Sequence, residues 1–149
     1  MSTKPTNPKD MVADGKLPLH LVPDTLDVFA ALAFLEGALK YGAYNWRVAG
    51  VRASVYRSAL DRHIKKWWNG EWADPDTGVP HLANAIACLA ILADATVAQK
   101  LIDDRPPSIH LAELIKATEL NVKQIKTVNR VVSNSVFLEP GLDLLHIGL

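Results

Sequence analysis

The sequence predicts an all-α protein, a helical bundle with an extended N-terminal arm and extra C-terminal helices. Three long stretches are rich in apolar helix formers, no stretch has a convincing strand pattern, and proline or glycine separates the stretches. With 149 residues, 49% of them hydrophobic and 21% charged, the chain has the composition of a globular protein with one main core. The predicted divisions are an extended arm at 1–23, a catalytic helical core at 24–104 and a C-terminal helical extension for packing or oligomerisation at 105–149.

The charge balance and hydropathy of the sequence limit the kinds of partner that we expect for the protein. Sixteen Lys and Arg balance sixteen Asp and Glu, so no net charge favours nucleic acid or a membrane surface, although local patches stay possible. The single cysteine, Cys88, lies in an apolar run and is expected to be a buried thiol in a reducing compartment. The chain shows no signal core and no membrane-spanning run. We therefore expect a protein of the host cell's cytoplasm, with no membrane and no stable nucleic-acid partner.

Four prolines within residues 1–23 fix backbone angles and remove amide donors, which predicts an extended arm that carries Lys9 and Lys16. Asp24 or Thr25 then suits the start of a helix over LDVFAALAFLEGALKYG, which is apolar on nearly all sides. Because so little of this helix is polar, it is expected to be central and buried.

The next two helices flank a polar turn. We expect AYNWRVAG to be a loop and Ser54 to cap a second helix that ends near Gly70. The residues of EWADPDTG are typical of a turn. Helical spacing places His63 on the apolar, inward side of that second helix. Pro80 suits the first turn of a third helix, in which His81 and Asn84 share one stripe near the amino end, where free amides favour an anion.

Arg105, Pro106 and Pro107 mark a linker, after which Ser108 can cap a helix through about Lys126. The tail superficially has the spacing of a DNA-reading helix-turn-helix, but Glu119 stands where a glycine would ease the turn. A helix pair for packing or oligomerisation is therefore favoured over DNA binding.

The chemistry-bearing residues concentrate between Arg62 and Asn84. Glu71 and Asp74 offer hard oxygen ligands beside His81 and Asn84, a set that suits Mg²⁺ or Mn²⁺. The alternative is a solvated loop in which Asp74 and Asp76 serve as turn residues. A calcium loop is excluded, because position 85 is Ala85 and not the required glutamate.

Two further patterns leave alternatives open. Glu36 and Lys40 stand four residues apart, as either a surface salt bridge or a carboxylate turned into a site. Trp46 and Trp72 fall in expected loops and are candidates for stacking on a nucleobase, which tolerates different bases.

The stretches LAFLEGALKYGAYNWRVAGVRASVY and RHIKKWWNGEWADPDTGVPHLANAIACLAIL, with TNPKD and KLPLHLVPDT before them, carry a family resemblance over residues 6–98. The chain resembles the phage-encoded dATP/dGTP diphosphohydrolases called MazZ, relatives of the all-α MazG-like nucleoside triphosphate pyrophosphohydrolases. The resemblance implies metal-dependent hydrolysis of dGTP or dATP to the monophosphate and pyrophosphate, in phages with 2-aminoadenine genomes. It also implies two or more Mg²⁺ or Mn²⁺ ions and a homodimer or dimer of dimers.

MazG relatives carry an ExxD pattern at the start of one helix, and this pattern aligns here with His81 and Asn84. Because the usual Glu and Asp are replaced, the missing negative charge is expected from carboxylates elsewhere in the chain. The implied catalytic residues are Glu36, Glu71 and Asp74. The implied metal ligands are Glu36, Glu71, Asp74, His81, Asn84, His63 and Asp61. By their own chemistry, the candidate phosphate contacts are Lys9, Lys16, Lys40 and Arg62, for each of which the alternative is a solvated surface residue. The candidate contacts to the base are Asn45 and Trp46. The alternative is a non-catalytic nucleotide-binding or regulatory protein that has lost full metal ligation.

Overall fold

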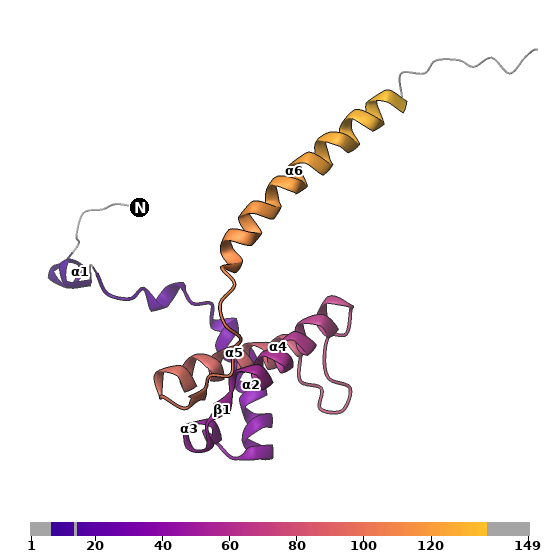
Figure 1. The fold of residues 1–149 in the computed structure, drawn as a ribbon. Helices are drawn as coiled ribbons and strands as arrows, with labels where there is room; N and C mark the ends of the chain where they lie inside the picture. Colours follow the sequence, from indigo (N-terminus) through magenta and orange to yellow (C-terminus); the bar gives the residue numbers. More distant parts are fainter. Residues whose placement is uncertain (1–6, 14, 137–149) are drawn as a thin grey trace, which may run out of the picture. The chain divides into compact units, whose positions relative to one another are not determined.

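A computed structural model describes residues 7–13 and 15–136, and it confirms the predicted all-α class (Figure 1). The chain divides into two compact units between Arg105 and Pro106. The elements, in order, are α1 (Pro8–Ala13), the 3₁₀ helix η1 (Leu19–Leu21), α2 (Asp24–Tyr41), α3 (Asn45–Ala49), β1 (Val51–Arg52), α4 (Ala53–Trp68), α5 (His81–Val97), β2 (Leu101–Ile102) and α6 (Leu111–Val136).

Helix α5 is the centre of the first unit, because it packs against both α2 and α4. Alanines form the seam between α2 and α5, and their short side chains let the two helices approach closely. Ala83 has no exposed surface at all, and the larger side chains lie around the alanines rather than between them. The seam consists of Ala33, Ala83 and Ala87, with Phe29, Phe34 and Val79 packed beside it.

A second cluster anchors the short segment between α2 and α4. Trp46, Val51 and Ala95 are buried together. Strands β1 and β2 pair in parallel, with Val51 opposite Leu101, and so tie the start of α4 to the chain that follows α5. A two-residue strand has no detectable alternation, which is why the sequence did not predict this pairing.

The arm differs from its predicted extended form, because residues Pro8–Ala13 are helical. The Asn7 side chain accepts the Lys9 N–H at 2.8 Å, as an N-cap does, and Pro8 occupies the first helical position, where its missing N–H costs nothing. The AYNWRVAG segment, predicted as a loop, likewise contains α3.

Ser54 is not the cap that was predicted, because α4 already begins at Ala53. Its hydroxyl donates instead to Oδ2 of Asp104 at 2.5 Å, and its N–H donates to Oδ1 of Asp104 at 2.9 Å. This pair fastens the start of α4 to the chain that follows β2.

The tail forms one 26-residue helix, α6, and not the predicted pair of helices with a break near Lys126. No glycine or proline occurs between Leu111 and Val136, so nothing local ends the helix. Within the described ranges, every helix is too short or too polar to cross a membrane.

Candidate functional site

A pocket of about 490 Å³, here called the polar pocket, collects many of the residues that the sequence singled out. Its walls come from α2, α3, α4, α5 and the turn between α4 and α5, so residues far apart in sequence converge on it. The lining includes Glu36, Lys40, Asn45, Arg62, His63, Asp74 and Asn84, together with Gly37, Tyr41, Val55, Tyr56 and Ala59.

Glu36 and Lys40 form an ion pair along α2, on the wall of this pocket. The Glu36 side chain is 17% exposed and the Lys40 side chain 50%, so the carboxylate lies inward and the ammonium outward. The hydrogen bond from Lys40 to Glu36 raises the pKa of Lys40. The ion pair of the first interpretation forms, and its carboxylate lines the polar pocket.

A chain of hydrogen bonds joins His63, His81 and Glu71. Nδ1 of His63 lies 3.1 Å from Nδ1 of His81, and Nε2 of His81 lies 3.0 Å from Oε1 of Glu71. Lys66 donates to the same Glu71 oxygen at 3.1 Å. The pKa of Glu71 is lowered by its hydrogen bond with His81 and, to a smaller extent, by that with Lys66. The pKa of His63 is lowered mainly by burial and, to a smaller extent, by the nearby His81.

This chain changes the expected metal set. His81 is completely buried, and both of its ring nitrogens already have partners, so it has no free lone pair for a metal ion. Glu71 faces His81 and Lys66 and does not line the polar pocket. Neither Glu71 nor His81, both expected as metal ligands, lines the polar pocket.

Asp74 is a turn residue whose side chain also lines the polar pocket. Its Oδ1 accepts the N–H groups of Asp76 at 3.0 Å and Thr77 at 3.3 Å, as a turn residue does, and these hydrogen bonds lower its pKa. The same side chain lines the polar pocket. Because the turn fixes the carboxylate in its ionised form, Asp74 presents a negative charge to the pocket.

Besides Glu71 and His81, three predicted residues line neither of the two pockets described in this section. Asp61 pairs with Arg57 one turn earlier on α4, at 3.0 Å, on an exposed face. Lys9 and Lys16 are exposed on the arm. Asp61 therefore does not line the polar pocket of its own chain.

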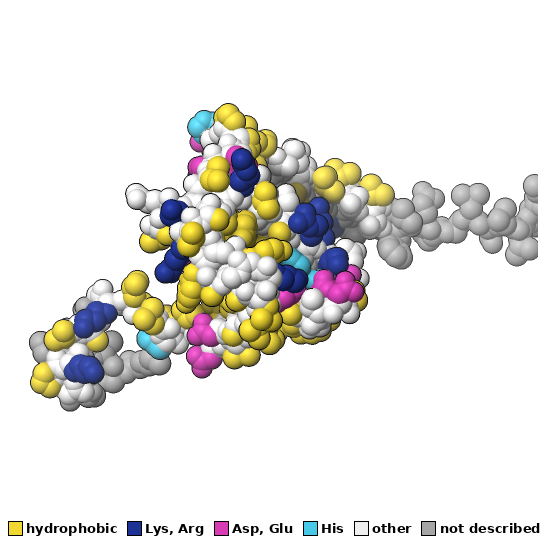
Figure 2. Space-filling model, turned by 90° about the horizontal axis from the view of Figure 1, so that it is seen from below, with side chains coloured by type: hydrophobic (Ala, Val, Ile, Leu, Met, Phe, Trp, Pro, Cys, Tyr) yellow, Lys and Arg dark blue, Asp and Glu magenta, His cyan; other side chains and the backbone are white. Residues whose placement is uncertain are grey.

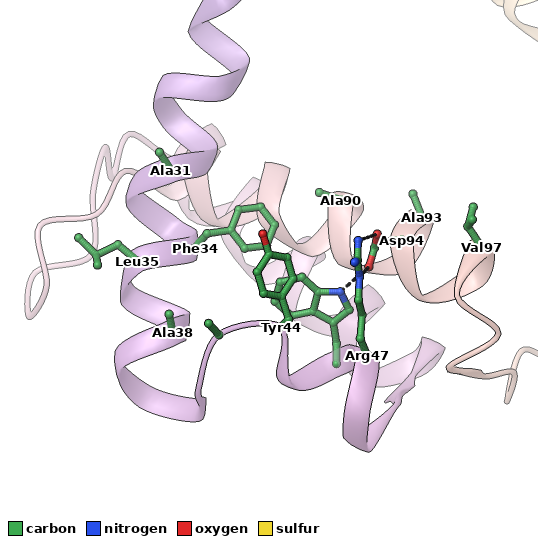
Figure 3. A pocket seen from close by; sticks show the side chains of 12 residues that line it. Ala31, Phe34, Leu35, Ala38, Tyr44, Arg47, Ala90, Ala93, Asp94 and Val97 are labelled. Atoms are coloured by element: carbon green, nitrogen blue, oxygen red, sulfur yellow. Dashed lines mark hydrogen bonds and ion pairs between the residues drawn. The ribbon is translucent and has the colours of Figure 1, made fainter.

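A second pocket, here called the apolar pocket, has a volume of about 840 Å³ and lies on the other side of α2 (Figure 3). Figure 3 shows Arg47 of α3 facing Asp94 of α5, with Phe34 and Tyr44 beside them. Arg47 donates twice to Asp94, at 2.8 and 2.7 Å, and Nε1 of Trp46 donates to Asp94 at 2.6 Å. These hydrogen bonds, from Arg47 first, lower the pKa of Asp94 to about 2.

Trp46 therefore does not join Asn45 at the polar pocket. Successive residues of a helix point about 100° apart, so Asn45 lines the polar pocket while Trp46 is buried beside the apolar one. The expectation of a loop is corrected here, because Asn45–Ala49 is helical and places the two side chains at different pockets.

The comparison with protein families identifies the enzyme family to which this site belongs. The profile of the family described as "dATP/dGTP diphosphohydrolase, N-terminal" matches residues 6–105. The chain belongs to this family. It is therefore an enzyme, a dATP/dGTP diphosphohydrolase, as its resemblance implied, and the match ends where the first compact unit ends. No curated protein and no solved structure matches the chain.

The residues of this diphosphohydrolase that could hold a divalent ion are the oxygen donors of the polar pocket, Glu36, Asp74 and Asn84. Among the described residues, no group of three or more His, Cys, Asp or Glu side chains is arranged to hold a metal. Mg²⁺ does not need such a group, because it keeps several waters and binds through one or two carboxylates together with substrate phosphates. Two carboxylates and an amide fit that chemistry.

Sequence reasoning missed Arg47 and Asp94, the charged pair of the apolar pocket. They stand 47 residues apart, and each looks like an ordinary surface residue of its own helix. Only the packing of α3 on α5 brings them together, so no local signal in the sequence could have found the pair.

Proposed function

We propose that this diphosphohydrolase cleaves dGTP or dATP between the α- and β-phosphorus atoms in the polar pocket, releasing the monophosphate and pyrophosphate. The observation that carries the proposal is that Glu36, Asp74 and Asn84 share one pocket with Lys40 and Arg62. A triphosphate needs both kinds of group, oxygen donors for a bridging cation and side-chain cations for its own charge.

Glu36, Asp74 and Asn84 would hold Mg²⁺ or Mn²⁺. When bound, such ions offset the charge on the phosphates and lower the pKa of a bound water. Two or more ions are proposed, as the resemblance to MazG relatives implies.

Arg62 and Lys40 are the proposed phosphate ligands. Arg62 enters no ion pair within the part of the chain that the structure describes, so its planar set of donors is free for bidentate contact with phosphate oxygens. Lys40 would exchange Glu36 for phosphate when Glu36 binds a cation. Lys9 and Lys16 remain proposed contacts from the arm, and Asn45 is the proposed polar contact to the base.

We also propose a homodimer or a dimer of dimers. Helix α2 is apolar on nearly all sides, yet it leaves large side chains exposed, and Leu39 is 81% exposed. Figure 2 shows hydrophobic side chains over much of one face of the molecule. Large exposed apolar side chains gathered on one helix are typical of a protein interface, and a second copy over α2 would also bring further donors to the site. The exposed leucines of α2 are Leu26, Leu32, Leu35 and Leu39.

The Leu39→Glu variant tests the assembly. Because a charge would have to be buried at the interface, we expect this variant to sediment as a monomer at a concentration at which the wild type is a dimer or tetramer. Val48→Glu is the matched control for an interface on α2, because Val48 lies in α3 and is 82% exposed, as much as Leu39. A wild type that sediments as a monomer would remove the proposed assembly.

The proposed reaction is tested by product analysis after incubation of the full chain with dGTP and Mn²⁺. We expect dGMP and pyrophosphate in equal amounts. Release of dGDP and orthophosphate would contradict attack at the α-phosphorus. Binding of dGTP without any turnover would favour the regulatory alternative. The setting in a phage pathway for 2-aminoadenine genomes is part of the proposal, since dGMP would feed that pathway while dATP is depleted.

A further inference from the structure

We propose that Glu71 and His81 fix the tautomer of His63, so that Nε2 of His63 accepts the proton of the water that attacks the nucleotide. His63 is the catalytic residue of this relay, and His81 and Glu71 are positioning residues. The proposal rests on the proposed function, because it assigns the proton acceptor of that same reaction.

The tautomers follow from the donors and acceptors along the relay. An ionised carboxylate only accepts hydrogen bonds, so the contact of 3.0 Å between Glu71 and Nε2 of His81 requires a proton on Nε2. A neutral imidazole carries one N–H, which leaves Nδ1 of His81 as an acceptor. Across the 3.1 Å contact, His63 must then donate from its own Nδ1. Nε2 of His63 is consequently the nitrogen with a free lone pair.

The opposite arrangement is disfavoured at the Glu71 end of the relay. A proton on Nδ1 of neutral His81 would place the lone pair of Nε2 against the Glu71 carboxylate. Lys66, which donates to the same carboxylate oxygen at 3.1 Å, favours its ionised form. The relay therefore runs in one direction, from His63 toward Glu71.

The position of His63 suits a base. It is half-buried and lines the polar pocket, while its Nδ1 edge is turned to His81, so the opposite edge with Nε2 is the part that the pocket can use. Burial lowers the pKa of His63, and His81, Lys66 and Arg62 lower it further against the opposing effect of Asp74. The lowered pKa favours the uncharged imidazole, the form that can take a proton.

The step balances as follows. The water oxygen forms a bond to the α-phosphorus as its proton moves to Nε2 of His63, and the bond from the α-phosphorus to the bridging oxygen breaks. The electron pair of that bond leaves with pyrophosphate. The His63 imidazolium keeps its Nδ1–H hydrogen bond to His81 and then gives the proton to pyrophosphate or to solvent. A buried acceptor behind the imidazole stabilises the imidazolium, as the carboxylate does in catalytic triads.

The first test is independent of activity. Long-range ¹H–¹⁵N correlation spectra of the full chain without substrate, near neutral pH, report which ring nitrogen of each histidine carries the proton. We expect His63 as the Nδ1–H form and His81 as the Nε2–H form. A proton on Nε2 of His63 in the resting enzyme would overturn the relay.

The second test is kinetic. His63→Asn retains a donor near the position of Nδ1 but removes the base, so we expect kcat with dGTP to fall about 100-fold or more while KM changes little. His110→Asn is the matched control: His110 is exposed, and its φ of 51° is a conformation that asparagine tolerates. A His63→Asn enzyme that folds and retains the wild-type kcat would refute the catalytic role while leaving the proposed function intact.

Glu71→Gln tests the positioning role. The Gln amide can donate to Nε2 of His81, which would reverse both tautomers and block the base. We expect a comparable fall in kcat together with a shift of His63 to the Nε2–H form, a spectroscopic change that a merely structural role would not produce. Unchanged tautomers and an unchanged kcat in Glu71→Gln would overturn the relay. A wild type that forms no dGMP would remove the proposed function and, with it, the catalytic role of His63, whatever tautomers the spectra report.

Discussion

Gly50 and Gly42 permit a sharp test of the packing that holds α3 in place. Both end a helix with nearly the same backbone angles: φ 77° and ψ 168° at Gly50, after α3, and φ 89° and ψ 146° at Gly42, after α2. Their surroundings differ. A Cβ atom on Gly50 would lie 2.9 Å from the carbonyl oxygen of Lys100, whereas one on Gly42 would have nothing within 4 Å.

The two alanine variants should therefore differ by the cost of the contact alone. Backbone angles in this region, which is nearly restricted to glycine, cost about 1–3 kcal/mol for another residue. That cost applies to both variants. At Gly50 the Lys100 carbonyl, which accepts the Val51 N–H at 3.0 Å, must also move, and forced displacement of packed atoms costs about 1–3 kcal/mol more. We expect Gly50→Ala to lose about 2–6 kcal/mol and Gly42→Ala about 1–3 kcal/mol.

Urea unfolding of both variants and the wild type, followed by far-ultraviolet circular dichroism, measures these differences. Protein concentration must be equal in all three, because oligomerisation would shift the midpoints by mass action. Equal loss in the two variants would refute the reasoning, since it would mean that the approach of Gly50 to Lys100 contributes nothing.

Two further predictions concern the site and the apolar pocket. Glu36→Gln and Asp74→Asn should each lower kcat with dGTP about 100-fold or more, because each removes a negatively charged oxygen ligand of the cation. Asp76→Asn, in the same turn as Asp74, is the control. A wild-type kcat in both site variants would place the metal elsewhere. Asp94→Asn should lower the urea midpoint at neutral pH, since the pKa of Asp94 is about 2 against its ordinary value of 3.8. A folded-state pKa below the unfolded value contributes stability above about pH 4 that is lost as the pH falls toward 2. The difference in urea midpoint between wild type and Asp94→Asn should therefore shrink over that range. A constant difference would contradict the assignment.

Much of the core followed from periodicity. The bounds of α2, α4 and α5 lie within a few residues of the apolar stretches that predicted them, and helical spacing correctly placed His63 inward. These features depend on neighbours three or four residues apart, which the sequence displays directly. The convergence of Glu36, Asp74 and Asn84 was likewise accessible, because each lies on or beside an element whose polar residues are few.

Contacts between distant segments were not accessible in this way. The sequence around Asp94 indicates a surface residue, and only the position of α3 brings Arg47 to it. Likewise, the sequence around Ser54 indicates a helix cap, whereas its hydroxyl donates to Asp104. His81 was taken for a ligand because its position at a helix start favours one; the decisive fact, its contact with His63 and Glu71 at full burial, depends on how three segments pack.

The most direct measurement of the proposed reaction is hydrolysis of dGTP by the full chain with Mn²⁺ in ¹⁸O-labelled water, followed by mass spectrometry of both products. Attack on the α-phosphorus places one ¹⁸O atom in dGMP and none in pyrophosphate. Label in pyrophosphate instead, or products other than dGMP and pyrophosphate, would contradict the mechanism proposed for the polar pocket.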